Sequence, residues 1–492
     1  MLAQPTRRIV PDRIARLMAV LVCGAAVWIF CHHTGLTPRA AAVALTASLM
    51  IGLWVTEAVP MGAASLLPLA FLPLLGVMSP AETARLYAEP NVFLFLGGFL
   101  LAIAMEEHGL HRRIALAILA RLGTGPRRMI GGFALSTGLL SMWISNTAST
   151  LLMLPIALAV IGRMDEILPE GRRQRFATAL LLAISYAASI GGIATLVGSP
   201  PNMILAGQAK TLLPHLPELS FVTWLRVMLP VAGGLLFICW VYLAVLCGGR
   251  GEGVAPAGTL DRLGPWTSAE RRVALIFALT VLGWVTREPI DLGWAVFPGW
   301  AKLIGAGRSH DAVVAVSAAL LLFTVPARDG AALLDERAFR RVPWEVLLLF
   351  GGGFALAEAF QVSGLAERAV SGAAALKGMT PWALVLCVCL ISTFASELMS
   401  NTAQVTLMVP LLAAASSTVG VHPYLLMVPA TLAASLAFMM PVGTPPNAIV
   451  FASGRLRLAD MVRAGFALNL IAAAWVTLCM FVFGLRGLGV SP

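Results

Sequence analysis

The chain has 492 residues, of which 59% are hydrophobic and only 12% are charged, and its formal net charge at pH 7 is +10. Soluble proteins carry roughly 25% charged residues, so this composition excludes a water-soluble globular fold. The basic residues gather in short loops between apolar runs, which fits membrane orientation rather than nucleic-acid binding. The seven cysteines lie inside apolar runs, and their spacing matches neither a metal site nor a disulfide framework.

The apolar runs predict an all-α polytopic membrane protein. A spanning helix needs about 20 mostly apolar residues. The first such run has no small-residue cleavage site after it, so we interpret it as a span rather than a signal peptide. Eleven transmembrane helices are predicted, at 14–33, 39–58, 61–78, 91–108, 176–206, 222–247, 271–286, 309–326, 343–360, 423–450 and 461–485.

Two further apolar stretches, 128–161 and 380–415, each carry a polar tripeptide at the middle. We interpret them as re-entrant hairpins that enter the membrane and return to the same side. Irregular backbone at membrane depth is tolerated only where protein or a water-filled cavity covers it, so the two tips should be buried in the protein. With this threading most lysines and arginines fall on one side, which predicts a cytoplasmic N-terminus and an outside C-terminus in the cell inner (plasma) membrane.

The two halves of the chain repeat each other. A shift of 255 positions aligns them without a gap over about 60 residues, and Ser145-Asn146-Thr147 then falls on Ser400-Asn401-Thr402. Further on, Gly198-Ser199-Pro200-Pro201-Asn202 matches Gly443-Thr444-Pro445-Pro446-Asn447. Five predicted spans separate the hairpins, and because five is odd the second copy is inverted. Inverted repeats are typical of secondary transporters.

A simpler alternative is that the repeated small residues only serve helix packing. This explanation suits Gly97-Gly98 and Gly352-Gly353, but it does not explain a repeated polar tripeptide followed by a repeated Pro-Pro-Asn. The predicted organisation is N-terminal scaffold helices over 1–126, the first half of a transport domain over 127–215, further scaffold helices over 216–379 and the second half of the transport domain over 380–492.

The repeated motifs suit ion binding. Two successive prolines remove backbone donors and prevent an uninterrupted helix. The break frees carbonyl oxygens, which suit a hard cation such as Na+, and it exposes the N-terminus of a half-helix, which suits an anion. No Lys or Arg is expected at the membrane depth of either motif, and neither motif contains His. An anion bound there would therefore need bound Na+ as its positive partner, whereas a neutral or cationic substrate would need none.

The segment Leu140–Ala148, the segment Tyr186–Gly192 and the doubled Ser-Asn-Thr and Gly-x-Pro-Pro-Asn motifs resemble the divalent anion/sodium symporter family. That family contains the sodium-coupled di- and tricarboxylate and sulfate transporters. The resemblance covers nearly the whole chain from about residue 39. It implies a homodimer with a static scaffold domain and a mobile transport domain that carries the site across the membrane as an elevator.

The resemblance also implies at least two Na+ sites and one substrate site. The first cation site would use Ser141, Ser145, Asn146 and the backbone of Gly198. The second would use Ser396, Asn401 and the backbone carbonyls of Met399 and Gly443. The substrate carboxylates would meet Asn146, Thr147, Asn401 and Thr402, and the pocket would be closed by Ser199, Pro200, Thr444 and Pro445. Ser396 and Ser199 stand where the family commonly has threonine, and both keep the hydroxyl.

Several acidic residues and histidines lie outside the motifs and need a separate interpretation. Glu107, His108 and His111 have helical spacing, but the arginines around them favour a basic amphipathic segment over 109–122 instead of a metal site. Glu397 precedes the second tip, where it can tune the cation site, accept a proton or be a plain hydrogen-bonded residue. Glu57, at the end of a span, is predicted to be interfacial.

These features favour a Na+-coupled symporter of C4-dicarboxylates such as succinate, malate and fumarate. The same architecture can instead carry sulfate or citrate, or exchange dicarboxylates. One carboxylate at each of two tips suits an extended diacid, whereas tetrahedral sulfate needs a compact donor cage. An intramembrane enzyme is disfavoured, because the sequence has no HExxH, no GxSxG and no pair of membrane acids with protease-like spacing. The expected partners are a small dianion, sodium ions, the lipid bilayer and a second copy of the chain.

Overall fold

The computed structural model describes residues 9–122, 125–248, 264–291, 296–305, 308–327, 330–370 and 377–488, and nearly all of its regular structure is helical. The first helices are α1 (Ile9–His33), α2 (Pro38–Thr56), α3 (Met61–Ala64), α4 (Leu67–Leu74), α5 (Pro80–Tyr87), α6 (Pro90–Glu107), α7 (Leu110–Leu122), α8 (Pro126–Ser141), α9 (Asn146–Ile167), α10 (Glu170–Gly192), α11 (Pro200–Leu212) and α12 (Phe221–Leu246).

The second part of the chain continues in the same way, with one small sheet. Its elements are α13 (Ser268–Val285), the antiparallel pair β1 (Ile290–Asp291) and β2 (Val296–Phe297), α14 (Ala301–Ile304), α15 (Asp311–Thr324), α16 (Ala338–Arg341), α17 (Trp344–Ser363), α18 (Leu365–Ala369), α19 (Pro381–Ser396), α20 (Asn401–Val419), α21 (Pro423–Ala434), α22 (Pro445–Ala452), α23 (Leu458–Cys479), the π-helical turn η3 (Met480–Gly484) and α24 (Leu485–Gly487).

Prolines mark where many of these helices begin. A proline is the first helical residue of α6, α8, α11, α19, α21 and α22. Its fixed φ suits the first turn, and the N–H that it lacks would have no partner inside the helix. The proline positions therefore set the starting points of α11 and α22, which carry the repeated Pro-Pro-Asn.

Nine helices in the described ranges are long and apolar enough to cross a membrane. Four further apolar stretches are shorter, at Met61–Leu74, Asp311–Thr324, Pro381–Ser396 and Pro423–Ala434. Two of the nine, α9 and α20, are the second arms of the predicted hairpins. Helix lengths thus agree with a polytopic membrane protein, while the eleven-span count, the re-entrant paths and the domain boundaries stay predictions.

Each predicted irregularity appears as a break between two helices. The first hairpin consists of α8 and α9, separated by residues 142–145, and the second consists of α19 and α20, separated by residues 397–400. The predicted spans 176–206 and 423–450 are interrupted between α10 and α11 and between α21 and α22. The predicted single span 61–78 is instead two short helices, α3 and α4.

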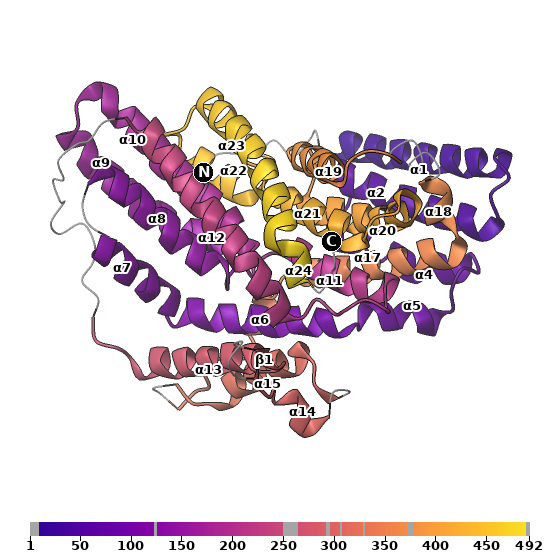
Figure 1. The fold of residues 1–492 in the computed structure, drawn as a ribbon, viewed down its shortest axis with the longest axis horizontal. Helices are drawn as coiled ribbons and strands as arrows, with labels where there is room; N and C mark the ends of the chain where they lie inside the picture. Colours follow the sequence, from indigo (N-terminus) through magenta and orange to yellow (C-terminus); the bar gives the residue numbers. More distant parts are fainter. Residues whose placement is uncertain are drawn as a thin grey trace.

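The helices pack in groups that bring distant segments together. α10 contacts α8, α9, α12 and also α22, so the first broken helix touches the second copy of the motif. Gly191 of α10 faces the Gly138 carbonyl of α8 so closely that a methyl group on Gly191 would overlap it. Figure 1 shows α8, α9, α10 and α12 toward one end of the molecule and α13, α14 and α15 as a layer on one side of α6, which α15 contacts.

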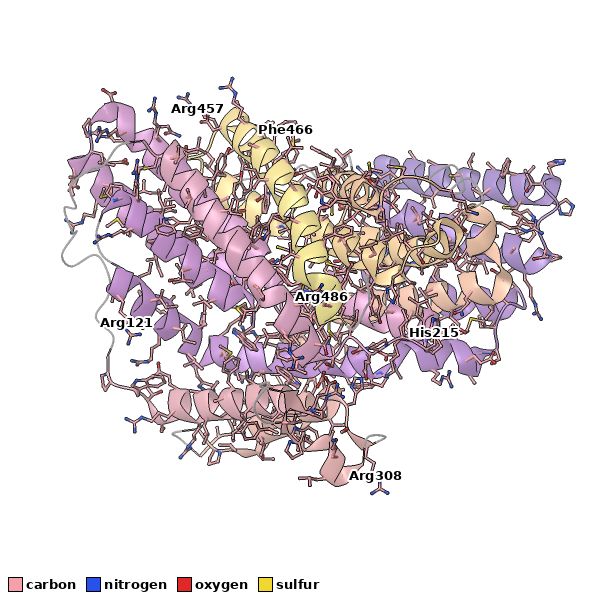
Figure 2. All side chains as sticks on the ribbon, in the orientation of Figure 1. Arg121, His215, Arg308, Arg457, Phe466 and Arg486 are labelled. Carbon is pink, nitrogen blue, oxygen red and sulfur yellow. The ribbon has the colours of Figure 1, made fainter. Side chains whose placement is uncertain are left out.

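The outer surface is largely apolar, as expected of a protein surrounded by lipid. Leu74, Val245 and Ile391 are 81%, 68% and 64% exposed. Exposed cationic side chains lie at the periphery, as Figure 2 shows for the labelled Arg121, Arg308 and Arg457.

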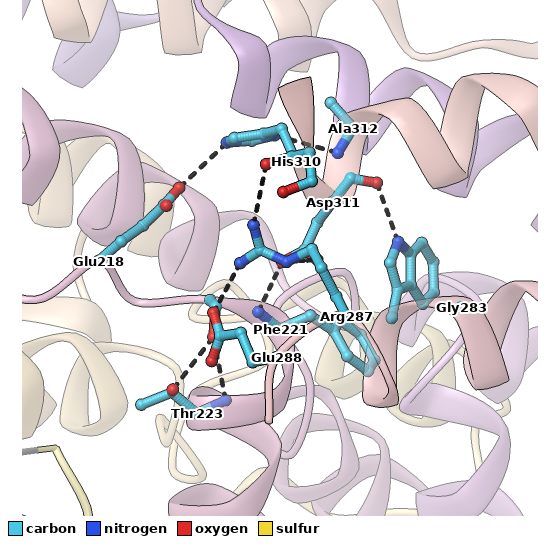
Figure 3. A network of polar contacts seen from close by, with 12 residues as sticks. Glu218, Phe221, Thr223, Gly283, Arg287, Glu288, His310, Asp311 and Ala312 are labelled. Atoms are coloured by element: carbon cyan, nitrogen blue, oxygen red, sulfur yellow. Dashed lines mark hydrogen bonds and ion pairs between the residues drawn. The ribbon is translucent and has the colours of Figure 1, made fainter. Parts of the chain in front are cut away.

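A buried ionic network ties α12, α13 and α15 together (Figure 3). Arg287, just after α13, lies 2.8 Å from the carboxylate of Asp311 at the start of α15, and both residues are buried. The other oxygen of Asp311 accepts a hydrogen bond of 2.8 Å from the backbone N–H of Phe221, the first residue of α12. Beside it, His310 contacts Glu218 at 3.1 Å. These contacts fix the start of α12 relative to α13 and α15.

Candidate substrate and cation site

The first tip places three oxygen atoms close together. Ser141 is the last residue of α8 and Asn146 is the first residue of α9. Ser141 Oγ lies 2.6 Å from Asn146 Oδ1 and 2.7 Å from the carbonyl oxygen of Ala188 in α10. A hydroxyl has one proton, so it can donate to only one of these two acceptors at a time. The tip is thus rich in oxygen lone pairs that the protein itself leaves partly unused.

Ser145 closes the turn of this tip. Its hydroxyl accepts a hydrogen bond of 3.1 Å from the backbone N–H of Ala148, which makes Ser145 the N-cap of α9. Serine is a preferred N-cap because its side chain satisfies an N–H that has no partner inside the helix. The Ser-Asn-Thr sequence therefore ends the irregular turn and starts the next helix in the same three residues.

The first break packs directly on the first tip. Thr195 donates a hydrogen bond of 2.5 Å to the carbonyl of Met142, and its hydroxyl accepts one of 3.0 Å from the Gly198 N–H. The amide of Asn202 donates to the carbonyls of Gly192 and Thr195, at 3.0 and 2.8 Å. The asparagine at the end of the Gly-x-Pro-Pro-Asn motif therefore holds the freed carbonyls of the break in place.

Two glycines allow this close approach. A methyl group on Gly192 would lie 2.5 Å from Asn146 Oδ1, and one on Gly198 would lie 2.6 Å from the Gly192 carbonyl. Real Cβ atoms do not come so close, so only glycine permits the tip and the break to meet with these backbone paths.

The second half repeats this construction. Ser396 ends α19, and its hydroxyl lies 2.5 Å from Asn401 Oδ1 at the start of α20 and also contacts the carbonyl of Ala434. The amide of Asn447 donates to the carbonyls of Ala437 and Met440, at 3.2 and 3.0 Å. In both copies the asparagine that ends the Gly-x-Pro-Pro-Asn motif thus bridges the same two positions of the break.

Both tips and both breaks line a single cavity of about 710 Å³. Four helices begin at its wall: α9 at Asn146, α11 at Pro200, α20 at Asn401 and α22 at Pro445. A helix N-terminus carries a partial positive charge of roughly half an elementary charge and unpaired N–H groups. The cavity therefore combines the electropositive ends of four helices with the hydroxyl and amide groups of the motifs.

The residues predicted for substrate contact all lie on the lining of this cavity, namely Asn146, Thr147, Ser199, Pro200, Asn401, Thr402, Thr444 and Pro445. Of the residues predicted to hold cations, Ser145, Asn146, Gly198, Met399, Asn401 and Gly443 also lie on it. Ser141 and Ser396 are fully buried behind the wall and touch it through the two asparagines. The structure thus brings the two sets together from segments about 255 residues apart.

Sequence reasoning missed three charged residues of the cavity wall. Arg341 lines it, and its guanidinium lies 2.7 Å from Glu106 and 3.7 Å from Glu107. Glu106 and Glu57 also line the cavity, and Glu57 caps the end of α2 with a left-handed φ of 50°. The expectation of no arginine near the site is therefore corrected. No local signal marks Arg341, because it follows a loop far from either motif in the sequence.

Glu397 is hydrogen-bonded to the second break and to α23. Its carboxylate accepts hydrogen bonds from the backbone N–H groups of Met439 and Met440 and from the Asn469 amide, each of 2.8 Å. The other acidic and histidine residues in the described ranges give no group of three that can hold a metal ion. His108 and His111 instead contact the carbonyls of Leu333 and Met105, at 2.7 and 3.0 Å.

The chain is similar to known transporters over most of its length. The family model described as the sodium:sulfate symporter transmembrane region matches residues 11–485. The sodium-dependent dicarboxylate transporter SdcS of Staphylococcus saprophyticus is 40% identical over 452 residues, which cover 89% of this chain and 85% of that protein. SdcS of Staphylococcus aureus strain NCTC 8325 is 40% identical over 441 residues, which cover 87% of this chain and 83% of that protein.

Two solved structures share the fold. The Alcanivorax borkumensis YdaH transporter has a TM-score of 0.54 at 14% identity and covers 82% of this chain and 88% of its own. Neisseria gonorrhoeae MtrF, described as illuminating a class of antimetabolite efflux pumps, has a TM-score of 0.55 at 14% identity and covers 82% of this chain and 84% of its own. The family match over nearly the whole chain confirms the resemblance seen in the motifs, and the chain therefore belongs to the sodium:sulfate symporter family and is a membrane transporter, not an enzyme.

Proposed function

We propose that this transporter couples the movement of Na+ to that of C4-dicarboxylates such as succinate, malate and fumarate. The observation that carries the proposal is the shared cavity. Asn146, Asn401 and four helix N-termini all line it. Its relatives at 40% identity bear the name sodium-dependent dicarboxylate transporter, which supports the same substrate class here.

The cations would occupy the oxygen clusters behind the two tips. Ser141 Oγ, Asn146 Oδ1 and the Ala188 carbonyl converge in the first half, and Ser396, Asn401 and Ala434 converge in the second. Hydroxyl, amide and carbonyl oxygens are hard ligands of the kind that alkali ions prefer, and freed carbonyls at a helix break serve this purpose in other transporters. We propose two Na+ sites, one at each cluster.

The dianion would lie between the tips, with one carboxylate near each helix N-terminus pair. Burying two negative charges is costly unless positive charge is close. Helix ends supply only partial charges. The wall also carries Arg341, but Glu106 at 2.7 Å already offsets its charge. Bound Na+ therefore supplies the missing charge, and this makes substrate affinity depend on the ions already in place.

We further propose that the site moves as an elevator within a homodimer in the plasma membrane, with a cytoplasmic N-terminus and an inverted repeat. Small residues support a sliding interface: a methyl group on Gly207 of α11 would overlap Phe354 of α17, and one on Gly353 of α17 would lie 2.5 Å from Thr406 of α20. These glycines let helices of the predicted transport and scaffold domains approach closely.

The test is uptake of labelled succinate into proteoliposomes that contain the purified full-length protein. An inward Na+ gradient should drive accumulation, and K+ or a proton gradient of the same size should not. Uptake that is indifferent to Na+ would contradict the coupling. Competition by unlabelled sulfate or citrate as strong as that by succinate would move the proposal to those anions, and uptake that requires internal dicarboxylate would indicate exchange.

A further inference from the structure

The second half of the site contains a buried carboxylate that the first half lacks. Glu397 is 5% exposed and directly follows Ser396, the last residue of α19. In the alignment of the two halves its counterpart is Met142, which is uncharged. At that position the first half has a hydrogen bond between neutral groups, from the Thr195 hydroxyl to the Met142 carbonyl.

The carboxylate of Glu397 holds the backbone of the second break. It accepts hydrogen bonds of 2.8 Å from the consecutive backbone N–H groups of Met439 and Met440. Asn469 of α23 completes the brace, since its amide donates to Glu397 at 2.8 Å and its side-chain oxygen accepts from the Phe438 N–H at 3.1 Å. Within the described residues, each of these hydrogen bonds to the Glu397 side chain is donated by an N–H group, so the carboxylate acts only as an acceptor.

The same carboxylate lies next to a predicted cation ligand. A methyl group on Gly443 would be 2.9 Å from Glu397 Oε2. Gly443 lines the cavity. Its carbonyl is one of the ligands that the family resemblance implies for the second cation site. A full negative charge therefore stands directly behind this site, in a region shielded from solvent where charge interactions are strong.

We propose that Glu397 makes the two cation sites unequal: through its brace on the second break and its fixed charge beside Gly443, it gives the second site the higher Na+ affinity, so that this site fills first. The inference rests on the proposed function, because it presumes one Na+ site in each half. Glu397 acts through the backbone that it positions, and is a positioning residue rather than a ligand.

The test is a Na+ titration of thermal unfolding with the full-length protein in detergent, at constant ionic strength with choline replacing Na+. A ligand that binds only the folded state raises the unfolding temperature with its concentration, so the half-saturating Na+ concentration can be read without transport. Glu397→Gln should raise that concentration about fivefold or more, because it removes a charge close to the ion. Glu397→Asp, which keeps the charge, should shift it less.

Asn469→Ala is the matched control, because it removes part of the brace but leaves the carboxylate. It should lower the unfolding temperature without Na+ and move the half-saturating concentration less than Glu397→Gln does. An unchanged half-saturating concentration in Glu397→Gln would overturn the proposal, and so would an equal shift in Asn469→Ala.

A second comparison does not depend on the folding of the Glu397 variants. Ser141→Ala removes a hydroxyl from the first cluster, and Ser396→Ala removes its counterpart from the second. If the second site is tighter, the Ser396→Ala protein should need more Na+ for half-saturation than the Ser141→Ala protein. Equal or reversed values would refute the inequality. A wild-type protein with no Na+-specific stabilisation would instead refute the proposed function itself.

Discussion

Ser185 of α10 donates a hydrogen bond to the side-chain oxygen of Asn447, 262 residues away in the second Gly-x-Pro-Pro-Asn motif. Both residues are fully buried. The amide of the same asparagine holds the carbonyls of the second break, so this contact joins a helix of the first half to the irregular backbone of the second half. The contact therefore holds α10 of the first half directly against the second copy of the motif.

Replacing Ser185 by alanine should destabilise the protein. Asn447 Oδ1 would lose its donor, and a buried acceptor left without a partner costs about 1–3 kcal/mol. The measurement is the change in thermal unfolding of the purified protein in detergent. Ser189→Ala is the control, because this hydroxyl lies one turn further along α10, is equally buried and has no hydrogen-bond partner in the described ranges. A loss of stability in Ser189→Ala as large as that in Ser185→Ala would contradict this account.

Asn146→Ala and Asn401→Ala should each abolish succinate uptake in proteoliposomes, while the protein stays folded in detergent. Each side chain lines the cavity and contacts the serine hydroxyl behind its own tip, at 2.6 and 2.5 Å. Size-exclusion chromatography checks the fold, and Ser417→Ala, an exposed position at the far end of α20, serves as the neutral control. If both variants fail to fold, the asparagines have a structural role instead.

Gly192→Ala should reduce the Na+-dependent rise in unfolding temperature without abolishing it, because the second cation site is untouched. The added methyl group would lie 2.5 Å from Asn146 Oδ1, so the tip must shift away from the break. Gly162→Ala in α9 meets nothing within 4 Å and should be neutral or stabilising by about 0.5–1 kcal/mol, because alanine restricts the unfolded chain more than glycine does. Normal Na+ titration of Gly192→Ala would show that the tip and the break do not form the cation site together.

Arg341→Gln should raise the KM for succinate by about two- to tenfold with a smaller effect on the maximal rate. The guanidinium neutralises Glu106, which also lines the cavity, so its removal would leave an unpaired carboxylate that lowers the local concentration of a dianionic substrate. The difference from wild type should shrink as ionic strength rises, since salt screens such repulsion. A change in maximal rate alone would point to a structural role in the contact with Glu106.

Acid should weaken the contact of Glu218, which lies outside the predicted spans, with His310. The hydrogen bond from His310 lowers the pKa of the Glu218 carboxyl from its ordinary 4.5 to about 2. A lowered carboxyl pKa stabilises the folded state above pH 4.5, and this contribution is lost as the pH falls from about 4.5 toward 2.

Glu218→Gln should therefore unfold with a shallower pH dependence over that range than wild type, as measured by thermal unfolding between pH 3 and 6. Glu166→Gln, at an exposed position on α9, is the matched control and should follow the wild-type curve. Identical acid curves for Glu218→Gln and wild type would exclude a contribution from this pair.

The sequence alone determined the membrane class, the helix breaks and the composition of the site. Apolar runs, proline pairs and the doubled Ser-Asn-Thr are local features, and local features suffice to say where a helix must stop and which polar groups remain there. For this reason α9, α11, α20 and α22 begin at the motif residues, whereas α10 and α21 already end at Gly192 and Ala434, several residues before their motifs. The same local features predict a single span over α3 and α4, because the turn between them carries no polar tripeptide or proline pair.

The tertiary structure decided which groups meet. That Asn146 and Asn401 share a cavity, that Ser185 reaches Asn447 and that Glu397 braces Met439 and Met440 are contacts between segments separated by tens to hundreds of residues. Such contacts depend on how whole helices pack, and no period or motif encodes them. Arg341 illustrates the difference: it ends the short helix α16, far from either motif in the sequence, and only the packing of α16 against α6 places its charge at the cavity wall.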